Sequence, residues 1–477
     1  MSILPPYPKG KSGEARFIGL DLHSSEIQAH TLLADGTALA PVRFVTSASN
    51  IELLRQELTP QDAVAMEATF NAFTVAQRLL PAGARTVISD QRKTRAIAEA
   101  KIKTDKIDAR VLAELLRVDY LPKVWLPDTA TIELRHLMSD RQSDVARRTE
   151  VKNRIHGVLQ RELLRGTQLF NSTAGETLLE LLVSEASPLP DYERARLVLL
   201  RTELAHLDEL VAAHEKALAR FITGQADLHA RLDRLLTITG ISLVVGAGLL
   251  SAIGDVTRFS SGKKLASYFG LVPSTHQSGA SKGFHGPITK QGRALARWLL
   301  LEAAEHTIKS PGPLRACYLR LKKKRNHNVA KTAVARKMCE LIWHLLTNEE
   351  DYLYQIPRLT AEKQARVKYL ATGEKAKSGS AKGTPRSTVY GTGLKGRQVK
   401  TAATRAAATA VEQAYETTVA ARAAGKRTVA AVVTPVNPLA PQAAAWEAAL
   451  AEQHARILAQ APRRPVARKK KVTPAEA

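Results

Sequence analysis

Short apolar runs, each ending at a charged or turn-forming residue, dominate residues 16–125. Three such runs come first, at Arg16–Asp21, Ile27–Leu33 and Val42–Val45. We expect all three to be β-strands, because short apolar runs bounded by turn signals are typical of strands. The Asp35-Gly36 pair, between the second run and the third, is such a turn signal.

Helical and strand-like patterns then alternate. Ser49, with Glu52 after it, forms a capping box and predicts the start of a helix. The next elements are a strand at Ala63–Glu67, a helix near Ala72–Leu80, a strand at Thr86–Ser89 and a helix from Asp105 to Leu116. Three strands followed by alternating helices and strands is the layout of an α/β RNase H-like (RuvC-like) domain. We place this domain at residues 16–125, after a flexible N-terminus at residues 1–15.

Residues 126–225 carry a helical pattern. Their apolar positions follow the spacing of a heptad seam, which predicts a helical linker made of a coiled coil or a long helical hairpin. His214 occupies a polar position of this seam, and Ser187-Pro188-Leu189-Pro190 ends the preceding helix because proline cannot continue it. The apolar seam residues are Leu197, Leu200, Leu204, Leu207, Val211 and Leu218.

Residues 226–355 are expected to form a second compact domain that is mostly α-helical. Within it, Thr239-Gly240-Ile241-Ser242 and the apolar helix that follows resemble a helix-hairpin-helix element. Such a turn presents backbone N–H groups to a phosphate. An ordinary helical turn is the other interpretation, because Ser242 stands where these hairpins often carry a second glycine.

The chain is strongly basic, with a formal net charge of +25. Residues 361–477 alone hold 21 Lys and Arg against 7 Asp and Glu. We therefore interpret residues 356–477 as a basic, low-complexity tail, partly disordered, whose Ala-rich stretches at 402–425 and 442–460 can form helices. This charge favours a nucleic-acid partner, since Lys and Arg neutralise phosphates, although a solvated basic surface is the alternative.

Signals for secretion or membrane insertion are missing from the sequence. The longest apolar stretch, around Ile241–Ile253, is too short to cross a bilayer, and the N-terminus has no apolar signal-peptide core. Cys317 and Cys339 suit neither a disulfide framework nor a zinc site. We expect a cytoplasmic protein with no membrane partner.

Four carboxylates lie where the expected fold would bring them together. Asp21 and Glu67 each end an apolar run, and Asp105 and Asp108 share one face at the start of a helical pattern. Converging carboxylates repel each other unless a cation lies between them, and hard oxygen ligands suit Mg²⁺ or Mn²⁺. Two such ions about 4 Å apart can stabilise the attacking and leaving oxygens of a phosphoryl transfer. Taken singly, each acid is more often a solvated residue or a helix cap.

A Gly/Ser-rich stretch at residues 271–293 is the second candidate site. Its glycines permit close approach to a phosphate, and a serine there can attack phosphorus once its hydroxyl is deprotonated. A surface loop is the alternative.

We also expect nucleic-acid contacts from three groups of cations, with a solvated charged face as the other interpretation. They are Arg147, Arg148, Lys152 and Arg154 in a helix, Lys282, Lys290 and Arg293 in this stretch, and the run Lys322, Lys323, Lys324 and Arg325.

At these residues the chain resembles the DEDD transposases (recombinases) of bacterial insertion sequences. That family joins a RuvC-like domain to a C-terminal serine-bearing transposase domain, and the resemblance covers roughly residues 16–350. The motifs that carry it are Gly19-Leu20-Asp21, Met66-Glu67-Ala68-Thr69, Lys103–Ala109, Tyr268–Pro273, Gln277-Ser278-Gly279 and Ile288–Gly292.

The resemblance implies a catalytic apparatus and a set of partners. The four acids Asp21, Glu67, Asp105 and Asp108 would bind Mg²⁺, and Ser278 would attack a DNA phosphate to form a phosphoserine link before strand exchange. Family members are guided by a bridge RNA that pairs with donor and target DNA. They work as homo-oligomers, here a dimer or tetramer, whose sites are shared between protomers. A bacterial protein that associates with the nucleoid when bound to DNA is also implied.

The sequence departs from the family pattern at several positions that leave the catalytic residues in place. Phe70 follows Glu67-Ala68-Thr69 where a glycine is common, and Leu22-His23-Ser24-Ser25 replaces a stretch that usually ends in lysine. Thr239 and Ser242 replace the proline and second glycine that are usual before and in the hairpin.

Our main hypothesis is an insertion-sequence transposase that cleaves and exchanges DNA strands through a serine nucleophile, with Mg²⁺ and an RNA guide. One alternative is a RuvC-like, structure-selective DNA nuclease that uses water and releases free cleaved DNA. The other is a non-catalytic nucleic-acid-binding protein. The presence of all four acids argues against the last, since a decayed site would be expected to lack at least one.

Overall fold

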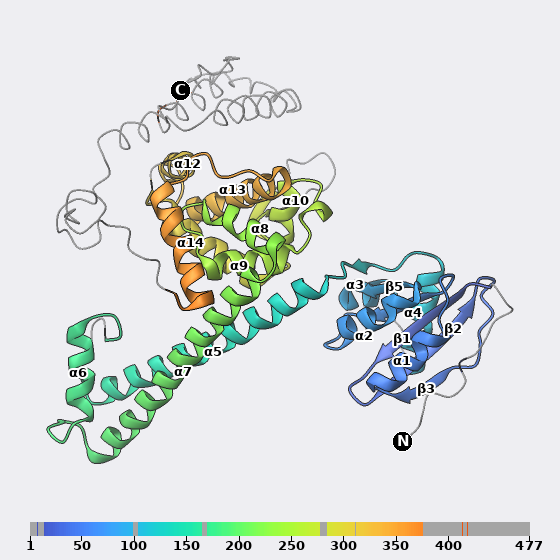
Figure 1. The fold of residues 1–477 in the computed structure, drawn as a ribbon, viewed down its shortest axis with the longest axis horizontal. Helices are drawn as coiled ribbons and strands as arrows, with labels where there is room; N and C mark the ends of the chain where they lie inside the picture. The colour runs from blue at the N-terminus through green and yellow to red at the C-terminus, as the bar shows by residue number, and fades with distance from the viewer. Residues whose placement is uncertain are drawn as a thin grey trace, which may run out of the picture. The chain divides into compact units, whose positions relative to one another are not determined.

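The computed structural model describes residues 7, 14–98, 104–164, 169–276, 284–310, 312–374, 413 and 417. The chain divides into two compact units, Met1–Thr129 and Ala130–Ala477 (Figure 1). Among the described residues, no helix is both long enough and apolar enough to span a membrane.

A six-stranded mixed sheet, in the order β3-β2-β1-β4-β5-β6, forms the centre of the N-terminal unit. The pairs β1–β2 and β2–β3 are antiparallel, β1–β4 and β4–β5 are parallel, and β5–β6 is antiparallel. The predicted α/β sheet is therefore confirmed, and β6 is a strand that the sequence pattern did not predict. The strands are β1 (Arg16–Leu22), β2 (Glu26–Leu33), β3 (Val42–Val45), β4 (Ala63–Glu67), β5 (Arg85–Ser89) and β6 (Lys123–Val124).

Each face of this sheet has its own apolar cluster. Ile18 and Leu20 of β1 belong to a cluster with residues of α1 and α2, whereas Phe17 packs with Leu112 and Leu116 of α4. The division follows from the alternation of side chains along a strand. The helices of this unit are α1 (Ala48–Glu57), α2 (Ala72–Leu79), α3 (Gln91–Ile97) and α4 (Asp105–Arg117), with a short 3₁₀ turn η1 (Leu80–Ala82).

The predicted capping box at Ser49 is wrong. The helix α1 begins at Ala48, and its N-cap is Ser47, whose hydroxyl accepts a hydrogen bond from the Asn50 amide. Ser49 therefore lies inside the first turn, where its side chain cannot serve as the cap. Glu52 pairs with Arg55 along the helix instead of reaching back to the cap.

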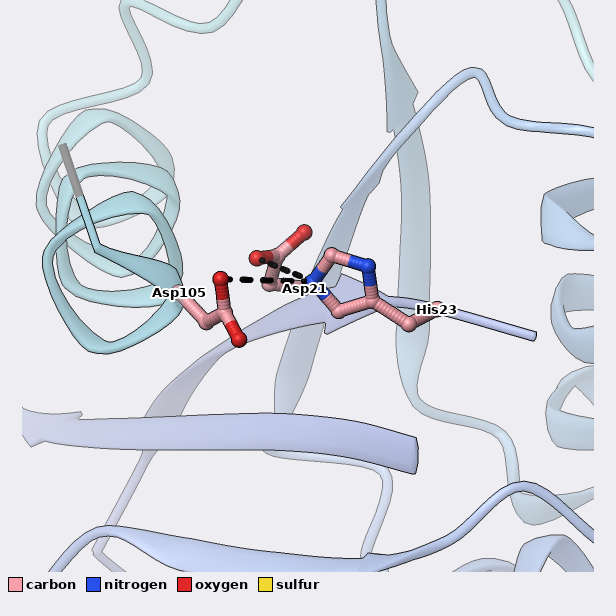
Figure 2. Close-up of side chains that lie close together, drawn as sticks. All are labelled: Asp21, His23 and Asp105. Atoms are coloured by element: carbon pink, nitrogen blue, oxygen red, sulfur yellow. Dashed lines mark ion pairs between the residues drawn. The ribbon is translucent and has the colours of Figure 1, made fainter. Parts of the chain in front are cut away.

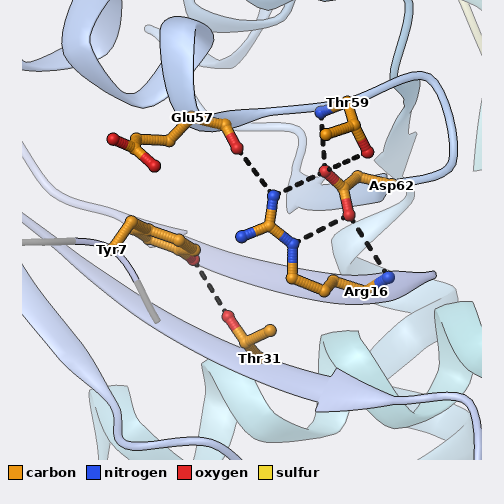
Figure 3. A network of polar contacts seen from close by, with 6 residues as sticks. All are labelled: Tyr7, Arg16, Thr31, Glu57, Thr59 and Asp62. Carbon is orange, nitrogen blue, oxygen red and sulfur yellow. Dashed lines mark hydrogen bonds and ion pairs between the residues drawn. The ribbon is translucent and has the colours of Figure 1, made fainter. Parts of the chain in front are cut away.

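A buried ion pair ties the start of β1 to the loop before β4 (Figure 3). Arg16 donates from Nε to Asp62 Oδ1 at 2.9 Å and from Nη2 to Asp62 Oδ2 at 2.7 Å. The second guanidinium nitrogen also reaches the Glu57 carbonyl, at 2.7 Å. Asp62 Oδ2 further accepts from the backbone N–H and the hydroxyl of Thr59. Both charges are thus paired and hydrogen-bonded, which is the condition for burying them.

Two long antiparallel helices open the second unit, α5 (Thr129–Arg161) and α7 (Asp191–Thr223), with α6 (Thr173–Val183) between them in the sequence. All the predicted apolar seam positions of α7 are buried, most of them against Val151, Ile155 and Val158 of α5. His214 Nε2 lies 3.0 Å from Asp144 Oδ2 of α5, so the polar position of the seam is paired. The N-cap of α7 is Pro190, at the predicted break.

The rest of the second unit is mostly helical, as predicted, around a large apolar cluster. Its helices are α8 (Ala226–Leu236), α9 (Leu243–Ile253), α10 (Gly262–Tyr268), α11 (Ala294–Thr307), α12 (Pro313–Lys322), α13 (His327–Asn348) and α14 (Pro357–Thr372), with a 3₁₀ turn η2 (Val256–Arg258). A two-stranded antiparallel sheet joins β7 (Pro273–His276) to β8 (Phe284–Ile288).

The turn between α8 and α9 packs inside the unit. Gly240 has φ +91°, and a β-carbon on it would lie 2.4 Å from the Ala303 carbonyl oxygen of α11. Lys363 donates to the carbonyls of Leu236 and Ile238 at 2.7 and 2.8 Å. Glycine is therefore needed here because α11 packs closely against the turn.

The packed chain continues beyond residue 356, where we expected the basic tail to begin. In α14, Val367 is 2% exposed and Lys363 is partly buried. Burial lowers the pKa of Lys363 to about 8. The predicted Ala-rich helices at 402–425 and 442–460 lie outside the described residues except for positions 413 and 417.

Candidate metal centre

The two strand-end acids lie on neighbouring parallel strands. Leu20 of β1 pairs with Met66 of β4, so Asp21 and Glu67, the next residues, come at the same edge of the sheet. Alternation along each strand places both acids on the face covered by α4, the face of Phe17 on β1 and of Ala65 on β4.

A glycine lets α4 approach this face closely. A β-carbon on Gly19 would lie 1.9 Å from the Ala109 carbonyl oxygen and 2.7 Å from the Ala113 amide nitrogen. Any side chain at this position would therefore push the helix away from β1. Because Asp105 opens α4 one turn before Ala109, this contact brings the start of the helix beside the carboxyl end of β1.

Asp21, Asp105 and His23 converge at that point (Figure 2). One donor atom from each side chain lies within 4.8 Å of the others. His23 Nε2 is 3.3 Å from Asp21 Oδ2 and 3.4 Å from Asp105 Oδ1. In the sequence, His23 stands out only as a departure from a family pattern. Its position two residues after Asp21, on the same face of an extended chain, was the signal that could have identified it.

Electrostatics connects a third acid to this group. Burial raises the pKa of Asp21, the negative charges of Asp105 and Asp108 raise it further, and His23 opposes the shift. Asp108 thus acts on Asp21 although it is outside the three-residue group. Glu67 is on the same face but likewise outside the group.

The donor set fits a divalent cation. Carboxylate oxygens are ordinary ligands for Mg²⁺ and Mn²⁺, and an imidazole nitrogen is an ordinary ligand for first-row transition metals. Asp21 is mostly buried, whereas the side chains of His23 and Asp105 are about half exposed, at 49% and 52%. The site is consequently open on one side, where a hollow of about 190 Å³ lies beside His23, Ser24, Ser25, Glu26, Gln28, Arg43 and Asp105.

Two residues of the second candidate site, Ser278 and Lys282, lie outside the described residues. The strands β7 and β8 flank their stretch in the sequence. At the base of these strands, Gly270 has φ +68°, and a β-carbon on it would meet the Gln291 backbone at 2.3 Å. Arg293 bonds to Tyr268, and although burial raises the pKa of this phenol, the bonds from Arg293 and Arg258 lower it overall. Lys290 is exposed.

The predicted cations of α5 are engaged within the protein. Arg147 pairs with Asp144, Arg148 with Asp208, and Arg154 with Glu203. Lys152 lies over the Phe170 ring, with its ammonium 5.0 Å from the ring centroid. The contacts of Arg148 and Arg154 tie α5 to α7, the Arg147 pair lies within α5, and Lys152 contacts the turn that precedes α6.

The run Lys322–Arg325 has a different environment. It lies at the end of α12 and in the turn before α13, and all four side chains are exposed. Lys322 lies over the Tyr318 ring at 5.6 Å. Within the described parts of the chain, no acid pairs with Lys323, Lys324 or Arg325.

Comparisons with known proteins match both units. Residues 18–163 match a family model for a DEDD transposase of the IS110 type, and residues 232–319 match one described as the transposase IS116/IS110/IS902 family.

Two curated relatives illustrate the extent of the similarity. The transposase for insertion sequence element IS1111A of Coxiella burnetii is 29% identical over 52% of this chain and 68% of its own length. A probable family 20 transposase of Pseudomonas aeruginosa is 27% identical over 70% of this chain and 98% of its own.

Proposed function

Because the chain belongs to the IS116/IS110/IS902 family of transposases, we propose that it is a site-specific DNA recombinase of an insertion sequence. The observation that carries the proposal is the convergence of Asp21, Asp105 and His23 at the carboxyl ends of two parallel strands. Transposition requires DNA cleavage, and among the described residues of the N-terminal unit this cluster has a donor set that suits a divalent ion.

We assign the N-terminal unit to the RNase H-like fold. The support is the strand order β3-β2-β1-β4-β5, in which the first three strands are antiparallel and the next two are parallel to β1. Asp21, Glu67, Asp105 and Asp108 would hold Mg²⁺ or Mn²⁺. When bound, the ion supplies charge stabilisation for the attacking and leaving oxygens at phosphorus.

Ser278 is the proposed nucleophile of the second unit. Its oxygen would form a bond to a DNA phosphorus while the bond from phosphorus to a deoxyribose oxygen breaks, and that oxygen would take up a proton. The resulting phosphoserine link would conserve the energy of the phosphodiester for strand exchange. Support comes from the match of residues 232–319 to the family model and from the motif Gln277-Ser278-Gly279.

Partners follow from the same proposal. Donor and target DNA would contact the exposed run Lys322–Arg325, where no acid of the described residues pairs with Lys323, Lys324 or Arg325. A bridge RNA and assembly into a dimer or tetramer are proposed from the family resemblance and the net charge of +25.

A denaturing gel of the protein with Mg²⁺, labelled donor and target DNA, and RNA from the flanking element tests this function. Wild type should give a covalent protein–DNA adduct that Ser278→Ala does not form. Free cleaved DNA from both proteins would instead identify a water-using, structure-selective nuclease. DNA binding without cleavage by either protein would favour the non-catalytic alternative.

A further inference from the structure

His23 occupies a position that the four-acid pattern does not include. Its Nε2 faces one oxygen of Asp21 and one of Asp105, at 3.3 and 3.4 Å (Figure 2). Donor atoms bound to one divalent ion at ordinary ligand distances are separated by about 3.0 to 3.5 Å. Both distances from Nε2 therefore match the separation of neighbouring ligands of one ion, and the three donor atoms lie within 4.8 Å of one another.

The backbone holds His23 firmly at this place. Its N–H donates to the Glu26 carbonyl at 2.9 Å, within the turn between β1 and β2. Its carbonyl accepts from the Thr46 hydroxyl at 2.9 Å and from the Asn71 amide at 3.4 Å. These bonds fix the backbone from which the imidazole extends, which limits the entropy lost when the side chain binds an ion.

We propose that His23 is a nitrogen ligand of the metal centre and sets its metal preference. This inference rests on the proposed metal function of Asp21 and Asp105. A site made only of carboxylates suits Mg²⁺, whereas an imidazole donor favours first-row transition ions. His23 should consequently raise affinity for Mn²⁺ relative to Mg²⁺.

The test measures metal binding by the full chain without DNA. The protein is titrated with Mn²⁺, and the electron paramagnetic resonance signal of the free ion gives the Mn²⁺ affinity. Displacement of bound Mn²⁺ by added Mg²⁺ then gives the Mg²⁺ affinity. In His23→Gln, Mn²⁺ affinity should fall by about tenfold or more, since even residues that only orient a ligand change metal affinity by 10- to 100-fold. Mg²⁺ affinity should change much less. The spin-echo modulation from a bound ¹⁴N should also disappear.

Two further variants separate the possible failures. His23→Asp makes the site all-oxygen and should shift the preference toward Mg²⁺. If His23→Gln lowers the affinity for both ions equally, or raises the affinity for both, the proposal is overturned. A higher affinity for both would mean that the imidazole is only a counter-ion between two acids. Asp21→Asn should lower the affinity for both ions. If it weakens neither, the metal centre itself is wrongly placed, and the proposed function fails with it.

Discussion

Gly19 lies directly beneath Ala109, so close that a β-carbon on the glycine would stand 1.9 Å from the alanine carbonyl oxygen. This contact joins β1 to α4 and thereby sets the distance between Asp21 and Asp105. The absence of a side chain at one position thus determines whether residues more than eighty positions apart in the sequence meet.

The substitution Gly19→Ala should damage stability and metal binding together. The added methyl group must displace α4, and overpacking of this kind costs about 1–3 kcal/mol, occasionally more. Asp105 would move away from Asp21 with the helix. Chemical denaturation should give a lower free energy of unfolding, and Mn²⁺ titration a weaker affinity.

Gly157→Ala is the matched control. Gly157 lies within α5, and a β-carbon there would meet only the end of Arg161, at 4.0 Å. Because alanine is the better helix former by about 0.5–1 kcal/mol, this variant should be slightly more stable. If both variants behave alike, close approach at Gly19 is not what positions α4.

Asp21→Asn should abolish DNA cleavage and leave duplex DNA affinity unchanged. The amide keeps the size of the side chain but removes the charge that holds a cation. We expect the cleavage rate to fall by about a hundredfold or more, the loss typical when one electrostatic stabiliser of a transition state is removed. Single-turnover cleavage and a filter-binding assay measure the two effects. Retained cleavage would refute the metal assignment.

The sequence predicted strands β1 to β5 and helix α4 well because those patterns are local. Alternation in β1 and apolar periodicity in α4 depend on residues close in the chain, and they placed Asp21 and Asp105 correctly at the ends of their elements. His23 was missed because its role depends on α4 lying across Gly19, a contact between distant segments. Ser47 was missed as a cap because Ser49 offers the same chemistry two residues later.

Asp62→Asn should destabilise the N-terminal unit by about 3–5 kcal/mol, because it leaves the buried Arg16 guanidinium without its counter-charge. Burial alone would raise the pKa of Asp62, but the hydrogen bonds from Arg16 and Thr59 outweigh burial and hold the pKa below its ordinary value. The stabilisation is therefore present above the unfolded-state pKa of about 3.9 and is lost as pH falls through the lower folded-state pKa.

Denaturation of wild type and Asp62→Asn at several pH values checks this sign. The difference between their free energies of unfolding should be largest at neutral pH and should shrink as the medium becomes strongly acidic. The double variant Arg16→Met with Asp62→Leu should recover part of the loss, since apolar replacements of a buried pair are often tolerated. A difference that grows toward low pH would contradict the argument.

Replacing Lys323, Lys324 and Arg325 together by alanine should reduce the salt dependence of DNA binding. Each cation that meets a phosphate contributes about 0.9 to the slope of log affinity against log salt concentration. No acid in the described residues competes for these three side chains, so the slope should fall by up to the full contribution of each.

The double variant Arg148→Ala with Arg154→Ala is the control, because it removes two cations that already contact Asp208 and Glu203. It should leave the slope nearly unchanged. If this double variant alters the slope while the triple alanine variant does not, DNA lies along α5. The ion pairs between α5 and α7 must then open when DNA binds.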